Sequence, residues 1–132
     1  MSQDTPTLIA RTLVALGVGL LTFVVLSSLR IRLQYLAPQP PAVGLVLSLL
    51  TYLVSGFATG MLLTRGHLPA GSVLGLFTVG VVWLEVPLRP GQLAPADLAT
   101  ALCAFAALGV VACAAGCVAA GFVRARRARV SR

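Results

Sequence analysis

One stretch of this chain, from Ala42 to Thr64, contains 23 residues and no charged side chain. As a helix it would be about 35 Å long, which is enough to cross the hydrocarbon core of a bilayer with some tilt. Charged residues make up only 10% of the whole chain, whereas soluble domains contain about 25%. We therefore expect an integral membrane protein whose outer faces contact the lipid bilayer.

Three more apolar stretches predict an all-α integral membrane bundle of four transmembrane helices in a single domain. The spans are expected at about residues 12–29, 42–64, 71–88 and 97–123, followed by a basic C-terminal tail at 124–132 that is mobile at its tip. Asp4 precedes the first span and no small-residue cleavage site follows it, which favours a helix over a signal peptide. Because only residues 65–70 connect the second and third spans, these two should form a tight antiparallel hairpin.

The second span is two-sided on a helical wheel. Its small and hydroxyl-bearing side chains share one arc, and its larger apolar side chains occupy the opposite face. Hydroxyls and close backbone approach hold helices together in lipid, so this polar arc should contact other helices. An alternative is that the arc lines a narrow polar path. Both hypotheses involve the same residues: Ser48, Thr51, Tyr52, Ser55 and Thr59, with Glu85 of the third span.

Glu85 is the acidic residue that falls within a predicted span. A carboxylate inside a membrane is costly and commonly functional, which suggests a group that handles a proton or a cation. The alternative is structural, because Arg89 lies four residues later on the same helix face and would form a salt bridge near the membrane surface.

Small residues predict close packing between helices. One Gly-x-x-x-Gly pair ends the second span and another opens the third, on either side of the short connection, so we expect the two pairs to pack against each other. The fourth span, which is rich in alanine, carries a further face of small residues. The predicted packing glycines are Gly56, Gly60, Gly71, Gly75, Gly109 and Gly116.

The cysteines and the histidine give little support for a metal site, and we predict no metal and no cofactor. A soft metal would suit a pair such as Cys113 and Cys117, which lie one turn apart, with Cys103 further along the helix. Cysteine is also a small apolar residue that fits a tight helix interface. His67 is expected to be a solvated residue in the second connection.

The arginines predict the orientation of the chain. Seven of the ten lie on the side that holds both termini and the second connection, and the other three are Arg30, Arg32 and Arg89. By the positive-inside rule, both termini lie in the cytoplasm, at a bacterial inner membrane. The net charge of +7 comes mostly from the tail beside the membrane, which argues against a nucleic-acid partner. The tail residues expected to contact anionic lipid are Arg124, Arg126, Arg127 and Arg129.

The run from Ser55 to Gly60, the dipeptide Arg65-Gly66, and the segment from Gly71 to Gly75 follow one another closely. This order resembles the YrzE-like group of small four-span bacterial membrane proteins, in which a glycine-rich run, basic residues and further glycine join the second and third spans. That group has no known function. The resemblance therefore implies a four-span membrane fold and supplies no site residues.

The sequence contains no nucleotide-binding loop, zinc signature or Ser/His/Asp set, and it has only three acidic residues and one histidine. We therefore expect a protein without enzymatic activity. The first hypothesis is a helix-packing or accessory component of a membrane assembly, associating with itself or with another membrane protein. The alternative is a small oligomeric transporter or channel for an ion or small solute.

Overall fold

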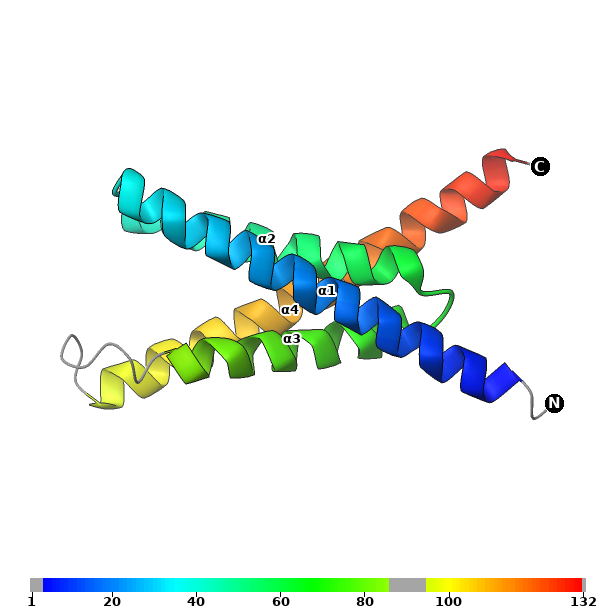
Figure 1. Cartoon of the computed structure of the whole chain (residues 1–132), viewed down its shortest axis with the longest axis horizontal. Coiled ribbons are helices and arrows are strands. Elements are labelled where there is room, and N and C mark those ends of the chain that lie inside the picture. Colours follow the sequence, from blue (N-terminus) through cyan, green and yellow to red (C-terminus); the bar gives the residue numbers. More distant parts are fainter. Residues whose placement is uncertain (1–3, 86–94, 132) are drawn as a thin grey trace.

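The computed structural model describes the backbone of residues 4–85 and 95–131, and the side chains of these residues except 4, 83–85, 95–98 and 101–102. The described chain consists of four helices: α1 (Asp4–Leu36), α2 (Pro41–Leu62), α3 (His67–Glu85) and α4 (Pro95–Val130). They form a helical bundle that is splayed at both ends (Figure 1). The all-α prediction is therefore confirmed.

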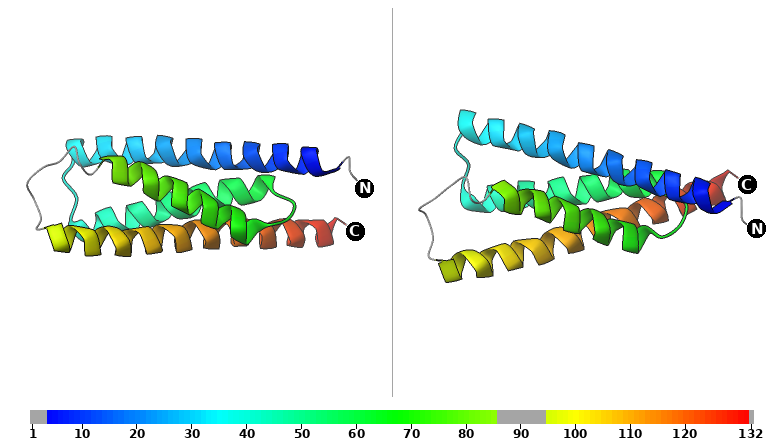
Figure 2. Two further views of the ribbon diagram at one scale, coloured as in Figure 1. Left: turned by 90° about the horizontal axis from the view of Figure 1, so that it is seen from below. Right: turned by 60° about the horizontal axis from the view of Figure 1, so that its bottom comes forward.

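Helix α4 is the centre of the bundle. Both α2 and α3 pack mainly against α4, and α1 lies on α2. Helices α2 and α4 run in the same direction, α3 runs the opposite way, and the first and last helical residues lie at the same end of the molecule (Figure 2). The short connection between antiparallel α2 and α3 is confirmed, but these two helices contact each other much less than either contacts α4.

Two helices extend well beyond their predicted ends. Helix α1 continues through Arg30, Arg32 and Tyr35, which were expected in a loop, because neither glycine nor proline occurs between Gly19 and Pro38. Helix α4 continues to Val130, so most of the expected tail is helical. Alanine and arginine favour helix strongly, and neither glycine nor proline follows Gly121.

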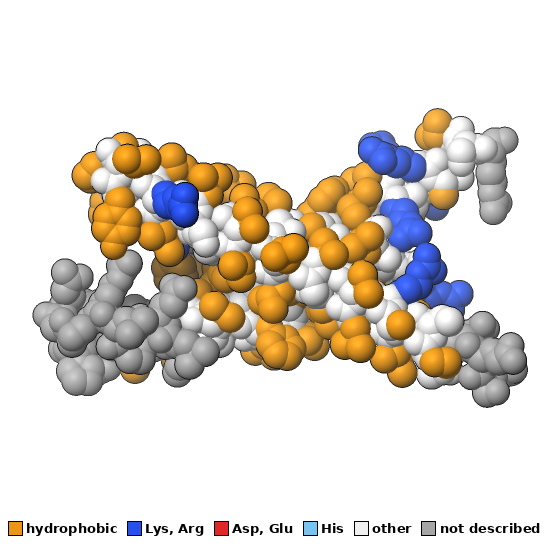
Figure 3. All heavy atoms as spheres, in the orientation of Figure 1, with side chains coloured by type: hydrophobic (Ala, Val, Ile, Leu, Met, Phe, Trp, Pro, Cys, Tyr) orange, Lys and Arg blue, Asp and Glu red, His pale blue; other side chains and the backbone are white. Residues whose placement is uncertain are grey.

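The surface and the helix lengths are those of a membrane protein. Within the described residues, α1, α2 and α4 are long and apolar enough to cross a bilayer. Helix α3 has 19 residues, and at 1.5 Å per residue it is about 28 Å long. Apolar side chains cover the middle of the molecule, and arginines lie toward its ends (Figure 3). The chain is therefore a multi-pass membrane protein.

Candidate functional site

The polar arc of α2 is buried, as the sequence predicted. Exposed fractions fall between 0 and 8% for its five members, which are Ser48, Thr51, Tyr52, Ser55 and Thr59. The opposite side of α2 is exposed at Val46, Leu50 and Val54, where it would contact lipid. The hydrophobic periodicity of the span therefore identified its packed face correctly.

The hydroxyl groups of this arc form hydrogen bonds mostly within their own helix. Ser48 donates to the Gly44 carbonyl at 2.8 Å, Thr51 to Leu47 at 2.8 Å, and Thr59 to Ser55 at 3.1 Å. Such bonds satisfy a buried hydroxyl without a partner on another helix. The serines and threonines of this arc therefore contribute to packing chiefly by their small size.

One polar contact joins α2 to α4 at the centre of the bundle. The Cys113 thiol of α4 donates to the Tyr52 carbonyl at 3.3 Å and lies 3.7 Å from the Ser55 hydroxyl. Cys113 and Cys117 are buried among other side chains, whereas Cys103 is exposed. The structure therefore uses Cys113 and Cys117 as small packing residues, one of which also forms a hydrogen bond.

Glycines allow the backbones of α2 and α4 to touch. A β-carbon at Gly56 would overlap the Cys113 carbonyl, and one at Gly116 would overlap the Leu53 carbonyl. Each glycine thus meets the residue three positions before the other, which makes the contact nearly two-fold symmetric. Next to it, a β-carbon at Gly60 would lie 2.5 Å from the Cys117 carbonyl oxygen. Gly-x-x-x-Gly packing of this kind brings helices close together in lipid.

The predicted contact between the two glycine pairs is wrong, because both pairs pack against α4. A β-carbon at Gly71 would lie 2.8 Å from the Ala114 Cα atom, and one at Gly75 would lie 2.6 Å from the Val110 Cα atom. Gly109 of α4 faces the Tyr52 ring, with a β-carbon distance of 3.1 Å. The alanine-rich fourth helix offers small side chains on two sides, so it accepts α2 and α3 together.

The sequence did not identify Gly19 of α1 as a packing residue. A β-carbon at this position would overlap the Thr59 hydroxyl and would lie 3.2 Å from the Ser55 carbonyl oxygen. A β-carbon at Gly17, two residues earlier, would meet nothing within 4 Å. Helical periodicity does not distinguish a single packed glycine from an open one, because both lie in the same apolar stretch.

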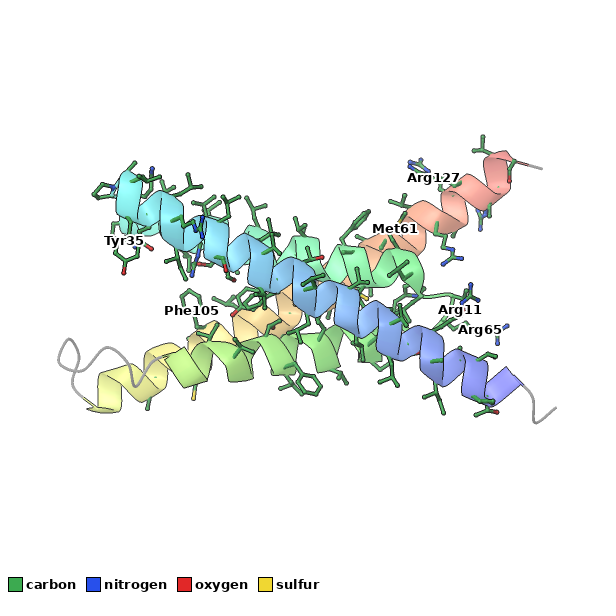
Figure 4. The ribbon with its side chains drawn as sticks, in the orientation of Figure 1. Arg11, Tyr35, Met61, Arg65, Phe105 and Arg127 are labelled. Atoms are coloured by element: carbon green, nitrogen blue, oxygen red, sulfur yellow. The ribbon has the colours of Figure 1, made fainter. Side chains whose placement is uncertain are left out.

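Side chains from all four helices line a partly open cavity of about 150 Å³ near the α1–α2 connection. Ser48, Thr51 and Tyr52 line it, together with Phe105 of α4 (Figure 4). Ser55 and Thr59 are fully buried and do not line it. The structure therefore divides the predicted polar path into a cavity at one end and solid packing at the other.

Arg30 is the charged residue among the described residues that line the cavity, and the sequence pattern did not identify it. Its Nη1 atom donates to the Ser48 hydroxyl, and its Nε atom is buried without a hydrogen-bond partner among the described residues. The prediction assigned Arg30 to a loop. Continuing the helix pattern past residue 29 would have placed Arg30 one turn after Ser27, on the cavity side of α1.

Glu85 and His67 are the two remaining polar residues that the sequence singled out. The side chain of Glu85 lies outside the described residues, and so does Arg89, although the backbone of α3 reaches Glu85. The prediction of a solvated His67 is wrong. His67 opens α3, is half-buried, and would lie 3.2 Å from a β-carbon at Gly121. The short connection brings this ring directly onto α4.

The arginines at the end with both termini have two kinds of environment. Arg124 donates to the Leu63 carbonyl at 2.8 Å and to the Met61 carbonyl at 3.3 Å, where α2 ends. Arg126, Arg127 and Arg129 are exposed on the part of α4 that projects from the bundle. Arg11, Arg65 and Arg127 lie at this same end (Figure 4). Contact of the exposed arginines with anionic lipid remains a prediction.

Comparisons with known proteins returned no match among protein-family models, curated proteins or solved structures. The resemblance to the YrzE-like group stays a prediction.

Proposed function

We propose that this chain is a non-enzymatic accessory component of a membrane assembly, which packs against another transmembrane helix through the outer face of α4. The predicted packing glycines are all occupied inside the bundle, so they supply no surface for a partner. A second small-residue face remains on the outside of α4. We call it the outer alanine stripe; its members, all exposed, are Ala104, Ala107, Ala115 and Ala119.

The outer alanine stripe is the observation that carries this proposal. Its members share one side of the helix, because their spacing follows the helical repeat. On a face toward lipid, alanine fills little volume, whereas against a second helix it permits close backbone contact. Two larger apolar side chains, Leu108 and Val111, are exposed on the same side of α4, with exposed fractions of 45% and 65%, whereas the exposed faces of α1 and α2 consist mainly of leucine and valine.

A cross-linking experiment in native membranes tests the proposal. In a Cys103→Ala background, where the remaining cysteines are buried, we expect Ala115→Cys to form covalent adducts with a membrane-permeant thiol cross-linker. Leu21→Cys on α1, with an exposed fraction of 64%, is the matched control and should form none. An adduct of twice the chain mass indicates self-association, and any other mass identifies a different partner. Equal adducts at both positions, or none at either, would contradict the proposal.

A small transporter or channel is the second candidate, and the cavity beside Arg30 favours it. The cavity offers hydroxyl groups and one cation inside the bundle. The route beyond Tyr52 is packed by Ser55 and Thr59, so transport would require these helices to separate.

A further inference from the structure

Arg30 carries a guanidinium group into the cavity, which we call the Arg30 cavity, and it is the one charged side chain among the described residues that line it. A guanidinium has five N–H donors. Ser48 accepts one of them, and the buried Nε donor has no partner among the described residues. A donor that is removed from water and left without an acceptor costs free energy, so an oxyanion beside Arg30 would be stabilised.

Two serines add uncharged donors to the same place. Ser27 and Ser28 also line the Arg30 cavity, and neither forms a hydrogen bond to a described residue. The Ser48 and Thr51 hydroxyls differ, because they donate to backbone carbonyls of α2. The α1 side of the cavity therefore holds the groups that are available to an anion.

A second cavity next to Arg30 is apolar. This leucine groove, of about 170 Å³, lies between α1 and α2 and shares Arg30 and Thr51 with the Arg30 cavity. Its remaining lining consists of aliphatic side chains: Leu26, Leu29, Leu33, Leu47, Leu50 and Val54. Most of these leucines are also exposed on the outer surface of the bundle, where lipid chains lie. A ligand for both cavities would have an anionic end and a hydrocarbon chain.

The depth of Arg30 matches a phospholipid phosphate. Helix α1 has 33 residues, and its length of about 50 Å exceeds the 40–45 Å of a bilayer with its headgroups. Leu36 ends the helix six residues after Arg30, so Arg30 lies about 9 Å below that end, at the level of the headgroups. We propose that Arg30 binds the phosphate of an anionic phospholipid, with one acyl chain in the leucine groove.

Lipid binding to the full-length protein, purified in detergent and stripped of lipid, tests this inference by native mass spectrometry. The probes are phosphatidylglycerol, phosphatidylcholine and inorganic phosphate. We expect one phosphatidylglycerol molecule to bind tightly to each protein. Phosphatidylcholine should bind more weakly, and inorganic phosphate should bind very little. Arg30→Gln should weaken phosphatidylglycerol binding about tenfold or more, the size of effect expected when charged hydrogen bonds are lost. Arg32→Gln is the matched control, since Arg32 is exposed on the same helix and lies outside both cavities.

Several results would overturn the proposal. Equal losses in Arg30→Gln and Arg32→Gln would mean that general surface charge attracts the lipid. If inorganic phosphate binds as tightly as phosphatidylglycerol, the acyl chain does not contribute to binding at this site. If phosphatidylglycerol binds only to the Glu85→Gln variant, then Glu85, which lies one turn after Val82 on α3, forms an ion pair with Arg30 in the native protein.

A second variant keeps the test decisive if Arg30→Gln does not fold. Replacing Ser27 and Ser28 together by alanine removes two hydroxyl donors from a helix surface and leaves the charge in place. We expect phosphatidylglycerol binding to weaken by about threefold, which corresponds to the loss of a neutral hydrogen bond. Unchanged binding in this double variant would then contradict the proposed site.

Discussion

At the scale of single residues, the glycines of this chain differ sharply in what surrounds them. Gly56 and Gly116 hold the backbones of α2 and α4 in contact, and Gly19 holds α1 against Thr59. Gly17 and Gly80 have open space around them. The contribution of a glycine to the stability of this bundle therefore depends on whether another helix lies against it.

This difference predicts opposite effects of the same substitution. Gly56→Ala should destabilise the protein by about 2 kcal/mol, because the new methyl group overlaps a backbone carbonyl that has no room to move. Gly17→Ala should be neutral or stabilise by up to about 1 kcal/mol, because alanine favours helix. Thermal unfolding of both variants in detergent measures the difference, and equal midpoints would show that the α2–α4 contact is not close.

The sequence predicted some of these residues and missed others for a physical reason. The buried polar residues of α2 recur once per helical turn along the span, so periodicity alone identified them. Gly19 and Arg30 lie on a helix that is mostly exposed, and their roles depend on which residues of α2 come beside them. Such a pairing follows from the tertiary arrangement and leaves no repeat in the sequence.

At the scale of helices, the sequence located all four elements but missed the ends of α1 and α4 and the packing partners of α2 and α3. Proline and glycine marked the start of α2 and the turn before α3, where Gly66 has a φ of 72°. Arginine-containing segments were expected to leave the helix, yet α1 and α4 continue through them. The preference of α2 and α3 for α4 over each other depends on matching surfaces, which a hydrophobic pattern does not encode.

The end of α2 is attached to α4 by Arg124, and this attachment gives a prediction for the pair of helices. Arg124→Gln should lower the free energy of unfolding by about 1 kcal/mol, because the last carbonyls of α2 lose a charged donor in a partly exposed place. Arg126→Gln, on the exposed side of the same helix, should change stability by less than about 0.5 kcal/mol. Chemical or thermal unfolding in detergent compares the two, and an equal loss would assign the effect to total charge.

At the scale of the whole molecule, both described ends of the chain lie on one side of the bundle, and most arginines gather there. We predict that this side faces the cytoplasm, because positively charged segments are retained there. A fluorescent protein should mature when fused to either terminus, and alkaline phosphatase should be active only when inserted at Gln39, between α1 and α2. Alkaline phosphatase that is active when fused to one terminus but not to the other would contradict the fold. Alkaline phosphatase that is active at both termini would agree with the fold and reverse its predicted orientation.

The central position of α4 also has a consequence for how the protein is made. Chains are synthesised from the N-terminus, so α2 and α3 enter the membrane before the helix against which both pack. Until α4 arrives, the glycine surfaces of both helices face lipid or one another without a close partner. The native contacts then form together, between segments separated by more than 50 residues in the case of Gly56 and Cys113. Assembly should therefore be a late, concerted event, and a ribosome stalled before α4 would leave three inserted but loosely associated helices, open to membrane chaperones and proteases.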